Sequence, residues 1–235
     1  EEFNRQAVDV LAEYYFAPTE RSKRNLLDEG KPVGRIFVTG NTGIDALRTT
    51  VREGYHNEHL DWAQGSRLVL LTAHRRESLG EPMVRMFRAV RRVMEEHPDV
   101  KAVYPIHMNP EVRRAAHAEL DGFDRLRIVE PLEVIDFHNF MAASHLVLTD
   151  SGGIQEEAPS LGKPVLVMRD TTERPEGVAC GTLREFSGRF QAFSQAFDQA
   201  KDGRSALFRC DGTRTGDNYP DALLRREKRG AHYGG

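Results

Sequence analysis

Six short apolar segments of the sequence each end in polar or glycine-rich residues that could bind an anion or move a proton. Imidazole and guanidinium groups donate hydrogen bonds to phosphate oxygens, and arginine can donate two at once. Polar loops are common, but six such ends carrying His, Arg and Gly-Gly favour a ligand-binding edge. The ends are Gly40-Asn41-Thr42, His74-Arg75-Arg76-Glu77, His107-Met108-Asn109, Glu130-Pro131, Asp150-Ser151-Gly152-Gly153 and Arg169-Asp170.

The most informative of these ends is the turn Ser151-Gly152-Gly153, which joins an apolar segment to a helical one. Backbone N–H groups of glycines and of a helix start can bind a phosphate. Glu157 follows about one helical turn later, so its carboxylate could accept hydrogen bonds from a sugar diol. The alternative is an ordinary tight turn in which Ser151 caps the helix.

Two cationic segments have both a ligand-binding and a structural interpretation. His74 and its two following arginines could bind phosphate oxygens, or could form a surface ion pair beside a structural histidine. Arg174, in the charged segment 169–176, could clamp a phosphate, although a charged run is usually a solvated surface. His56 and His59 have the spacing of a metal pair, but without neighbouring ligands a solvated helix face is favoured, and we predict no metal site. The chain contains no G-x-G-x-x-G, P-loop or G-x-S-x-G motif.

The elements that must position these residues alternate between apolar segments and amphipathic helical ones. The apolar segments are 35–39, 68–72, 102–106, 126–129, 146–149 and 165–168, and 83–96 has apolar residues at helical spacing. Unbroken apolar strands are typical of a parallel sheet covered by helices on both faces. The sequence therefore predicts a doubly wound α/β domain over about residues 35–180. Before it, a helix should begin after Thr19 and end near Gly30.

Composition excludes several other classes of protein. The 235 residues carry 33 Lys+Arg and 36 Asp+Glu, a net charge of −3, which argues against nucleic-acid or membrane-surface partners. No segment approaches the roughly 18 apolar residues of a membrane span. The two cysteines, Cys180 and Cys210, favour neither a disulfide scaffold nor a thiolate metal site, and a reducing cytoplasm is the expected setting.

The long segment from Asp150 to Glu176 resembles the non-hydrolysing UDP-N-acetylglucosamine 2-epimerases. Four further segments resemble the same family in the same order, so that the resemblance covers residues 1 to about 184. They are 16–20, 37–42, 72–77 and 104–110.

The resemblance implies a GT-B fold, with two Rossmann-like domains and a UDP-sugar between them. Phe137 would contact the uracil, Glu157 the ribose, and Ser151 to Gly153 the diphosphate. His107 would lie near a second, activating UDP-sugar site. The full set of implied UDP contacts is His74, Phe137, Ser151, Gly152, Gly153, Glu157 and Arg174.

The implied reaction interconverts UDP-GlcNAc and UDP-ManNAc without a cofactor. The C2 proton is removed and UDP leaves, giving 2-acetamidoglucal, and UDP then adds back with the proton on the opposite face. Such chemistry needs acids and bases at C2 and donors that stabilise departing UDP. Glu1 and His74 match the family's catalytic positions, and full-length members tend to form homodimers.

The resemblance also predicts the domain organisation. Residues 1–34 would be a remnant of the N-terminal domain and linker, and 35–183 the UDP-binding C-terminal domain. The chain starts at Glu1 without Met, so we expect a fragment of a longer enzyme that cannot epimerise by itself. Residues 184–235 depart from the family, which a frameshift or a divergent end would explain, with a helix compatible with 185–200 and disorder after it.

Two other functions remain open at this point. A GT-B glycosyltransferase would share the UDP-binding domain but transfer the sugar to an acceptor. A non-catalytic nucleotide-sugar binding module would only bind UDP. The Asp-Ser-Gly-Gly run followed by Thr-Glu-Arg-Pro-Glu favours the epimerase.

Overall fold

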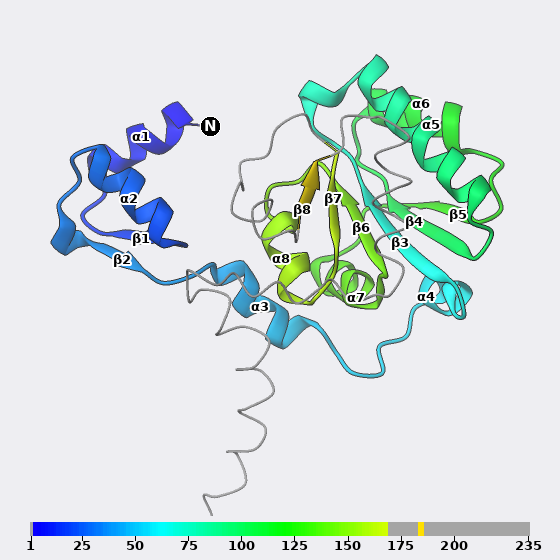
Figure 1. Cartoon of the computed structure of the whole chain (residues 1–235), viewed down its shortest axis with the longest axis horizontal. Helices are drawn as coiled ribbons and strands as arrows, with labels where there is room; N and C mark the ends of the chain where they lie inside the picture. Colours follow the sequence, from blue (N-terminus) through cyan, green and yellow to red (C-terminus); the bar gives the residue numbers. More distant parts are fainter. Residues whose placement is uncertain (1, 169–182, 186–235) are drawn as a thin grey trace, which may run out of the picture. The chain divides into compact units, whose positions relative to one another are not determined.

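The computed structural model describes residues 2–168 and the backbone of residues 183–185, in two compact units that divide between Ala46 and Leu47. Figure 1 shows the elements of each unit along the chain. Each unit is described by itself.

The smaller unit is built on two short parallel strands. Its elements are α1 (Glu2–Leu11), β1 (Tyr15–Ala17), α2 (Glu20–Asp28), the 3-10 turn η1 (Val33–Arg35) and β2 (Ile36–Val38). The predicted start of α2 is confirmed, because the Thr19 side chain accepts a hydrogen bond from the N–H of Ser22 at 3.1 Å. Gly30, just past the helix end, has φ +80°, a conformation that favours glycine. Tyr15, Ala17 and Ile36 form the core of this unit.

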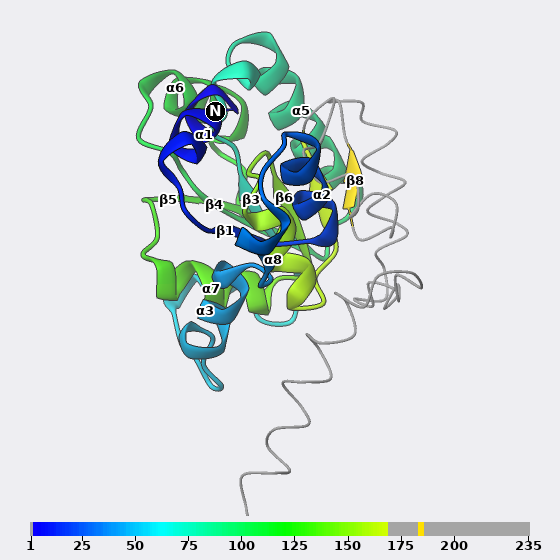
Figure 2. The same cartoon turned by 90° about the vertical axis from the view of Figure 1, so that its left-hand side faces the viewer.

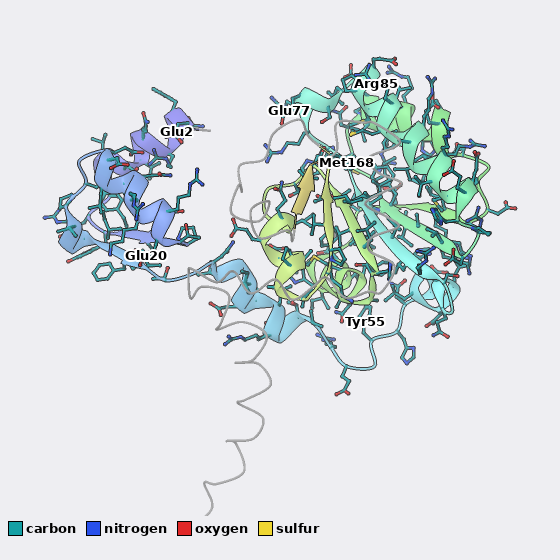
Figure 3. All side chains as sticks on the ribbon, in the orientation of Figure 1. Glu2, Glu20, Tyr55, Glu77, Arg85 and Met168 are labelled. Atoms are coloured by element: carbon teal, nitrogen blue, oxygen red, sulfur yellow. The ribbon has the colours of Figure 1, made fainter. Side chains whose placement is uncertain are left out.

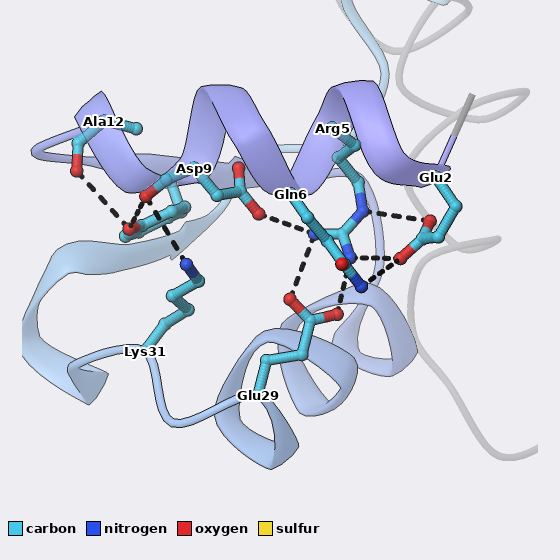
Figure 4. A network of polar contacts seen from close by, with 8 residues as sticks. Glu2, Arg5, Gln6, Asp9, Ala12, Glu29 and Lys31 are labelled. Carbon is cyan, nitrogen blue, oxygen red and sulfur yellow. Dashed lines mark hydrogen bonds and ion pairs between the residues drawn. The ribbon is translucent and has the colours of Figure 1, made fainter.

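One arginine holds α1 to the segment that follows α2 (Figure 4). Arg5 pairs with Glu2 and Asp9 on its own helix, the latter at 2.6 Å, and with Glu29 at 2.6 Å. Lys31 donates to the backbone oxygen of Asp9 at 3.4 Å. The contact of Arg5 with Glu29 therefore joins α1 to the end of α2 within this unit.

The larger unit contains a parallel sheet of six strands in the order β5-β4-β3-β6-β7-β8. The strands predicted within residues 68–168 are confirmed, and the doubly wound α/β class with them. Their bounds are β3 (Arg67–Thr72), β4 (Val100–Pro105), β5 (Leu126–Val129), β6 (Leu146–Thr149), β7 (Val165–Val167) and β8 (Leu183–Glu185).

Apolar side chains alternate along each strand between two helical layers. On β3, Val69 and Leu71 pack with buried residues of α5 and α6, whereas Leu68 and Leu70 pack with those of α7 and α8. Each fully buried side chain of this size contributes about 1.5–3 kcal/mol. The helices are α3 (Thr42–Thr50), α4 (Glu58–Ala63), α5 (Glu81–Glu96), α6 (Pro110–Leu120), α7 (Val134–Ala143) and α8 (Ile154–Ser160), with the 3-10 turn η2 at Arg76–Ser78.

Figure 2, turned by 90°, again shows α5 and α6 on one side of the sheet and α7 and α8 on the other. All strands are parallel, so their carboxyl ends meet at one edge. Figure 3 labels Met168, directly after β7, and Glu77, in the loop after β3, at that edge, with Tyr55 toward the opposite one.

Two sequence predictions about strands differ from the structure. Residues 35–39 were expected to supply the first strand of the larger sheet, and this is wrong, because β2 pairs with β1 in a separate two-stranded sheet. A short apolar run looks the same in either sheet, so the sequence could not distinguish them. The strand β8 was not predicted at all.

The remaining predictions about domains stay predictions. The structure divides the chain after Ala46, later than the boundary expected after residue 34. Residues 186–235, including most of the predicted helix at 185–200, lie outside the described residues. Within the described part, no helix combines the length and hydropathy that crossing a membrane requires.

Candidate functional site

The candidate site lies where the strand order reverses. The chain passes from β3 to β4 and β5 on one side, and then returns to β6, β7 and β8 on the other. Loops after β3 and β6 therefore diverge to opposite faces, and open α/β sheets bind ligands at such a point. His74 follows β3 and the turn Ser151-Gly152-Gly153 follows β6, so the structure brings these two predicted segments together.

Hydroxyl groups join the last residues of the two strands. Thr72 and Thr149 face each other in register, and their Oγ1 atoms lie 2.7 Å apart in a buried hydrogen bond. The Thr149 Oγ1 also accepts the N–H of Ser151 at 2.9 Å. That bond fixes the first residue of the Ser-Gly-Gly turn.

Asp150 connects the turn to the loop that carries His74. Its side chain is fully buried, and Oδ2 accepts the backbone N–H groups of His74 and Arg75, each at 2.8 Å. Oδ1 lies 3.7 Å from Nε2 of His74 and has no hydrogen-bond partner. The sequence marked Asp150 only as a strand end. Its position directly after an apolar strand and before Ser-Gly-Gly is the signal that pointed to it.

His107, which the family resemblance places near a second UDP-sugar site, lies beside His74. Their rings stack with centroids 5.5 Å apart and planes 26° from parallel. The Nδ1 of His107 accepts the N–H of Asn109 at 3.1 Å, which places the proton of a neutral ring on Nε2. Burial, and then the charge of Asp150, raise the pKa of Tyr104, whose hydroxyl donates to the Ala73 carbonyl at 2.9 Å. This bond holds the backbone just before His74.

Of the two glycines of the turn, Gly153 is exposed and lies beside Glu157. Neither Gly152 nor Gly153 has a positive φ, so backbone conformation is not what requires glycine here. A Cβ on Gly153 would lie 3.8 Å from the Oε1 of Glu157, an ordinary van der Waals distance, so Gly153 is next to this carboxylate.

Glu157 lies against a buried histidine that the sequence did not identify. Its Oε2 is 3.8 Å from Nε2 of His138, and the Nδ1 of His138 bonds the hydroxyl of Thr50 at 2.7 Å. Burial, and secondarily the charge of Glu156, raise the pKa of Glu157. Burial lowers the pKa of His138. A neutral His138 beside a half-buried carboxylate leaves Glu157 able to accept hydrogen bonds from a ligand.

The predicted uracil contact, Phe137, is on the same helix as His138. Phe137 is half-buried against the α7 and α8 layer, and its ring lies 6.5 Å from that of His138. The adjacent Asn139 bonds the backbone of Thr50 and Arg52 and so fixes the segment that packs on this helix. Phe137 therefore lies next to the histidine that contacts Glu157.

Two predicted residues cannot be placed. Glu1 and Arg174 lie outside the described residues, so their roles stay predictions. Among the residues that the structure does describe, no cluster of metal-ligating side chains is found. Of the two histidines considered as a metal pair, His59 contacts Arg127 at 3.1 Å and His56 lies 3.6 Å from Asp61.

Comparison with known proteins identifies close relatives of the chain. Residues 1–215 match the family model described as UDP-N-acetylglucosamine 2-epimerase. A Bacillus subtilis protein of that name is 62% identical over 184 residues, which are 78% of this chain and 48% of the relative. The chain spans about half the length of the curated relatives it matches.

Solved structures agree with this comparison. An S. aureus MnaA–UDP co-structure has 50% identity and a TM-score of 0.82, over 86% of this chain and 55% of that one. A Neisseria meningitidis UDP-GlcNAc 2-epimerase bound to UDP-GlcNAc has 38% identity and a TM-score of 0.79, over 96% of this chain and 65% of that one.

Proposed function

The chain belongs to the UDP-N-acetylglucosamine 2-epimerase family, and from this premise we propose that its larger unit binds UDP and the UDP-sugar in an enzyme that interconverts UDP-GlcNAc and UDP-ManNAc. The observation that supports this most strongly is the meeting of the His74 loop and the Ser-Gly-Gly turn at the point where strand order reverses. Relatives solved with UDP and with UDP-GlcNAc support the same class of ligand.

The diphosphate would lie against the turn Ser151–Gly153 and His74. The turn offers backbone N–H groups and a surface without side chains, both suited to an anion. His74 can donate to the departing UDP, which is the charge that elimination must stabilise. Arg174 would add a cationic contact.

The nucleoside would lie against α7 and α8. The Phe137 ring offers an apolar face for uracil, and the Glu157 carboxylate can accept both ribose hydroxyls. Glu157 is partly buried, so water hydrates its carboxylate poorly. Hydrogen bonds from the ribose diol would take the place of that weak hydration.

We propose further roles for the family's other positions. Glu1 would act as an acid or base at C2, and His107 would contact a second UDP-sugar. The full-length protein would work as a homodimer. An epimerase also fits the family model better than a glycosyltransferase or a binding module does.

Calorimetric titration with UDP tests the proposed ligand. We expect binding by the chain, and about 10–100-fold weaker binding for Glu157→Ala and Arg174→Ala, because each removes a charged hydrogen-bonding group. His117→Ala, an exposed change on α6, serves as the control and should bind normally. Failure of the unchanged chain to bind UDP would contradict the proposal.

A second assay separates epimerase from transferase. The protein that contains this chain should form UDP-ManNAc from UDP-GlcNAc with no sugar acceptor present. Turnover only when an acceptor is added would favour a glycosyltransferase.

A further inference from the structure

The buried carboxylate of Asp150 has one oxygen whose role the proposed function does not explain. Oδ2 accepts two backbone N–H groups, but Oδ1 is inaccessible to solvent and has no hydrogen-bond partner. Burying a charged oxygen without a donor is costly, so such an atom usually serves a purpose.

His74 is the donor within reach of this oxygen. Its Nε2 lies 3.7 Å from Oδ1, a few tenths of an ångström beyond a hydrogen bond. The nearby hydroxyl of Tyr104 is already committed to the Ala73 carbonyl. The ring of His107 stacks on that of His74, with centroids 5.5 Å apart.

We propose that Asp150 is a positioning residue, which fixes the loop of His74 through two backbone bonds and holds the His74 proton on Nε2 through Oδ1. Nδ1 is then the nitrogen left to meet a ligand. A positively charged ring in this orientation would donate Nδ1–H to a bound anion and Nε2–H to Asp150. The link to ligand rests on the proposed UDP-binding function, whereas the link between Asp150 and His74 does not.

Asp150→Asn tests the pair with little change in shape. In the variant, the amide oxygen would accept the two backbone N–H groups, because the amide NH₂ can only donate. The NH₂ would then face Nε2 of His74 and force the ring proton to Nδ1. The control is Asp99→Asn, which removes a carboxylate bonded to Arg67 at 2.6 Å at the opposite end of β3.

Nitrogen-15 NMR of the His74 ring reports the tautomer directly. The spectrum is recorded without ligand, well above the ordinary imidazole pKa of about 6.5. We expect the proton on Nε2 in the unchanged chain and in Asp99→Asn, and on Nδ1 in Asp150→Asn. A proton on Nδ1 in the unchanged chain, or the same tautomer in all three, would overturn the proposal. If Asp150→Asn does not fold, the Nε2 proton of the unchanged chain decides: slow exchange with water supports contact with the buried Oδ1, and fast exchange overturns the proposal.

UDP titration of the same proteins tests the consequence for ligand. We expect Asp150→Asn to bind UDP about ten-fold more weakly, because the carboxylate no longer orients the His74 ring toward the ligand, and Asp99→Asn to bind normally. A changed tautomer with unchanged affinity would refute the positioning role. If none of the proteins binds UDP, the proposed function is wrong. The tautomer of His74 still tests the contact between Asp150 and His74.

Discussion

The candidate site contains two histidine–carboxylate pairs, and the more buried member is the carboxylate in one pair and the histidine in the other. In the pair of His74 and Asp150, the carboxylate is fully buried and the histidine is 39% exposed. In the pair of His138 and Glu157, the histidine is 7% exposed and the carboxylate 22%. We propose that the more exposed member of each pair meets the ligand: His74 donates a hydrogen bond to the diphosphate, and Glu157 accepts hydrogen bonds from the ribose.

The buried members differ in how the fold supports them. Asp150 is held by two backbone N–H groups of the neighbouring loop, so it connects two strand ends. His138 is held by one hydroxyl, that of Thr50. The pair of His74 and Asp150 should therefore matter more for stability, and the pair of His138 and Glu157 should give stability a clearer dependence on pH.

The largest effect is expected for Asp150→Ala. The change removes the acceptor of the backbone N–H groups of His74 and Arg75, where β3 and β6 end. The free energy of unfolding should therefore fall by about 2–4 kcal/mol. Urea denaturation measures the loss. The matched control, Asp99→Ala, removes an ion pair from an exposed carboxylate and should cost under about 1 kcal/mol. Equal losses would show that Asp150 is not a structural connection.

A smaller effect is expected for Thr50→Val. Valine keeps the branched shape but removes the hydroxyl that bonds Nδ1 of His138, so we expect a loss of about 1 kcal/mol in urea denaturation. Thr42→Val, at an exposed position on the same helix, is the control. An unchanged midpoint for Thr50→Val would mean that His138 gains nothing from this bond.

The free energy of unfolding should depend on pH in part through the protonation of His138. Burial lowers its pKa in the folded chain, so the unfolded chain takes up this proton more readily. The contribution of His138 is therefore present above about pH 6.5 and is lost as pH falls through the lower folded pKa. His138→Gln should flatten this part of the stability curve, whereas the exposed His56→Gln should not. The same slope in both variants would contradict this account.

Glu157 should show the opposite sign. Its raised folded pKa means that the folded chain holds this proton more tightly than the unfolded chain does. Its contribution is full below the unfolded pKa of about 4.3 and is lost as pH rises through the folded pKa. Relative to the unchanged chain, Glu157→Gln should gain stability over that rise. A relative loss there would show that the carboxylate is stabilised by partners rather than strained by burial.

The sequence predicted β3 to β7 of the larger sheet because their apolar runs are unbroken and end in recognisable turns, whereas β8 has no such run. It also predicted His74 and the Ser-Gly-Gly turn, because parallel strands place their carboxyl ends at one edge. It did not predict the sheet to which residues 36–38 belong, since a short strand carries no record of its partner.

The supporting residues were harder to find in the sequence. The bond between Thr50 and His138 joins residues 88 positions apart, and that between Asp150 and the His74 backbone joins residues 76 apart. Such pairs depend on the register of β3 against β6 and on the packing of α7, which no local pattern encodes.

The most direct test of the central claim is amide NMR of the chain during titration with UDP. We predict shifts of the amide signals of His74, Ser151, Gly152, Gly153 and Glu157, at the edge where the two pairs lie. The amides of Arg67 and Asp99, at the opposite ends of the strands, should stay unchanged. Shifts confined to other parts of the chain, or no shifts at saturating UDP, would contradict a UDP site at this edge of the sheet.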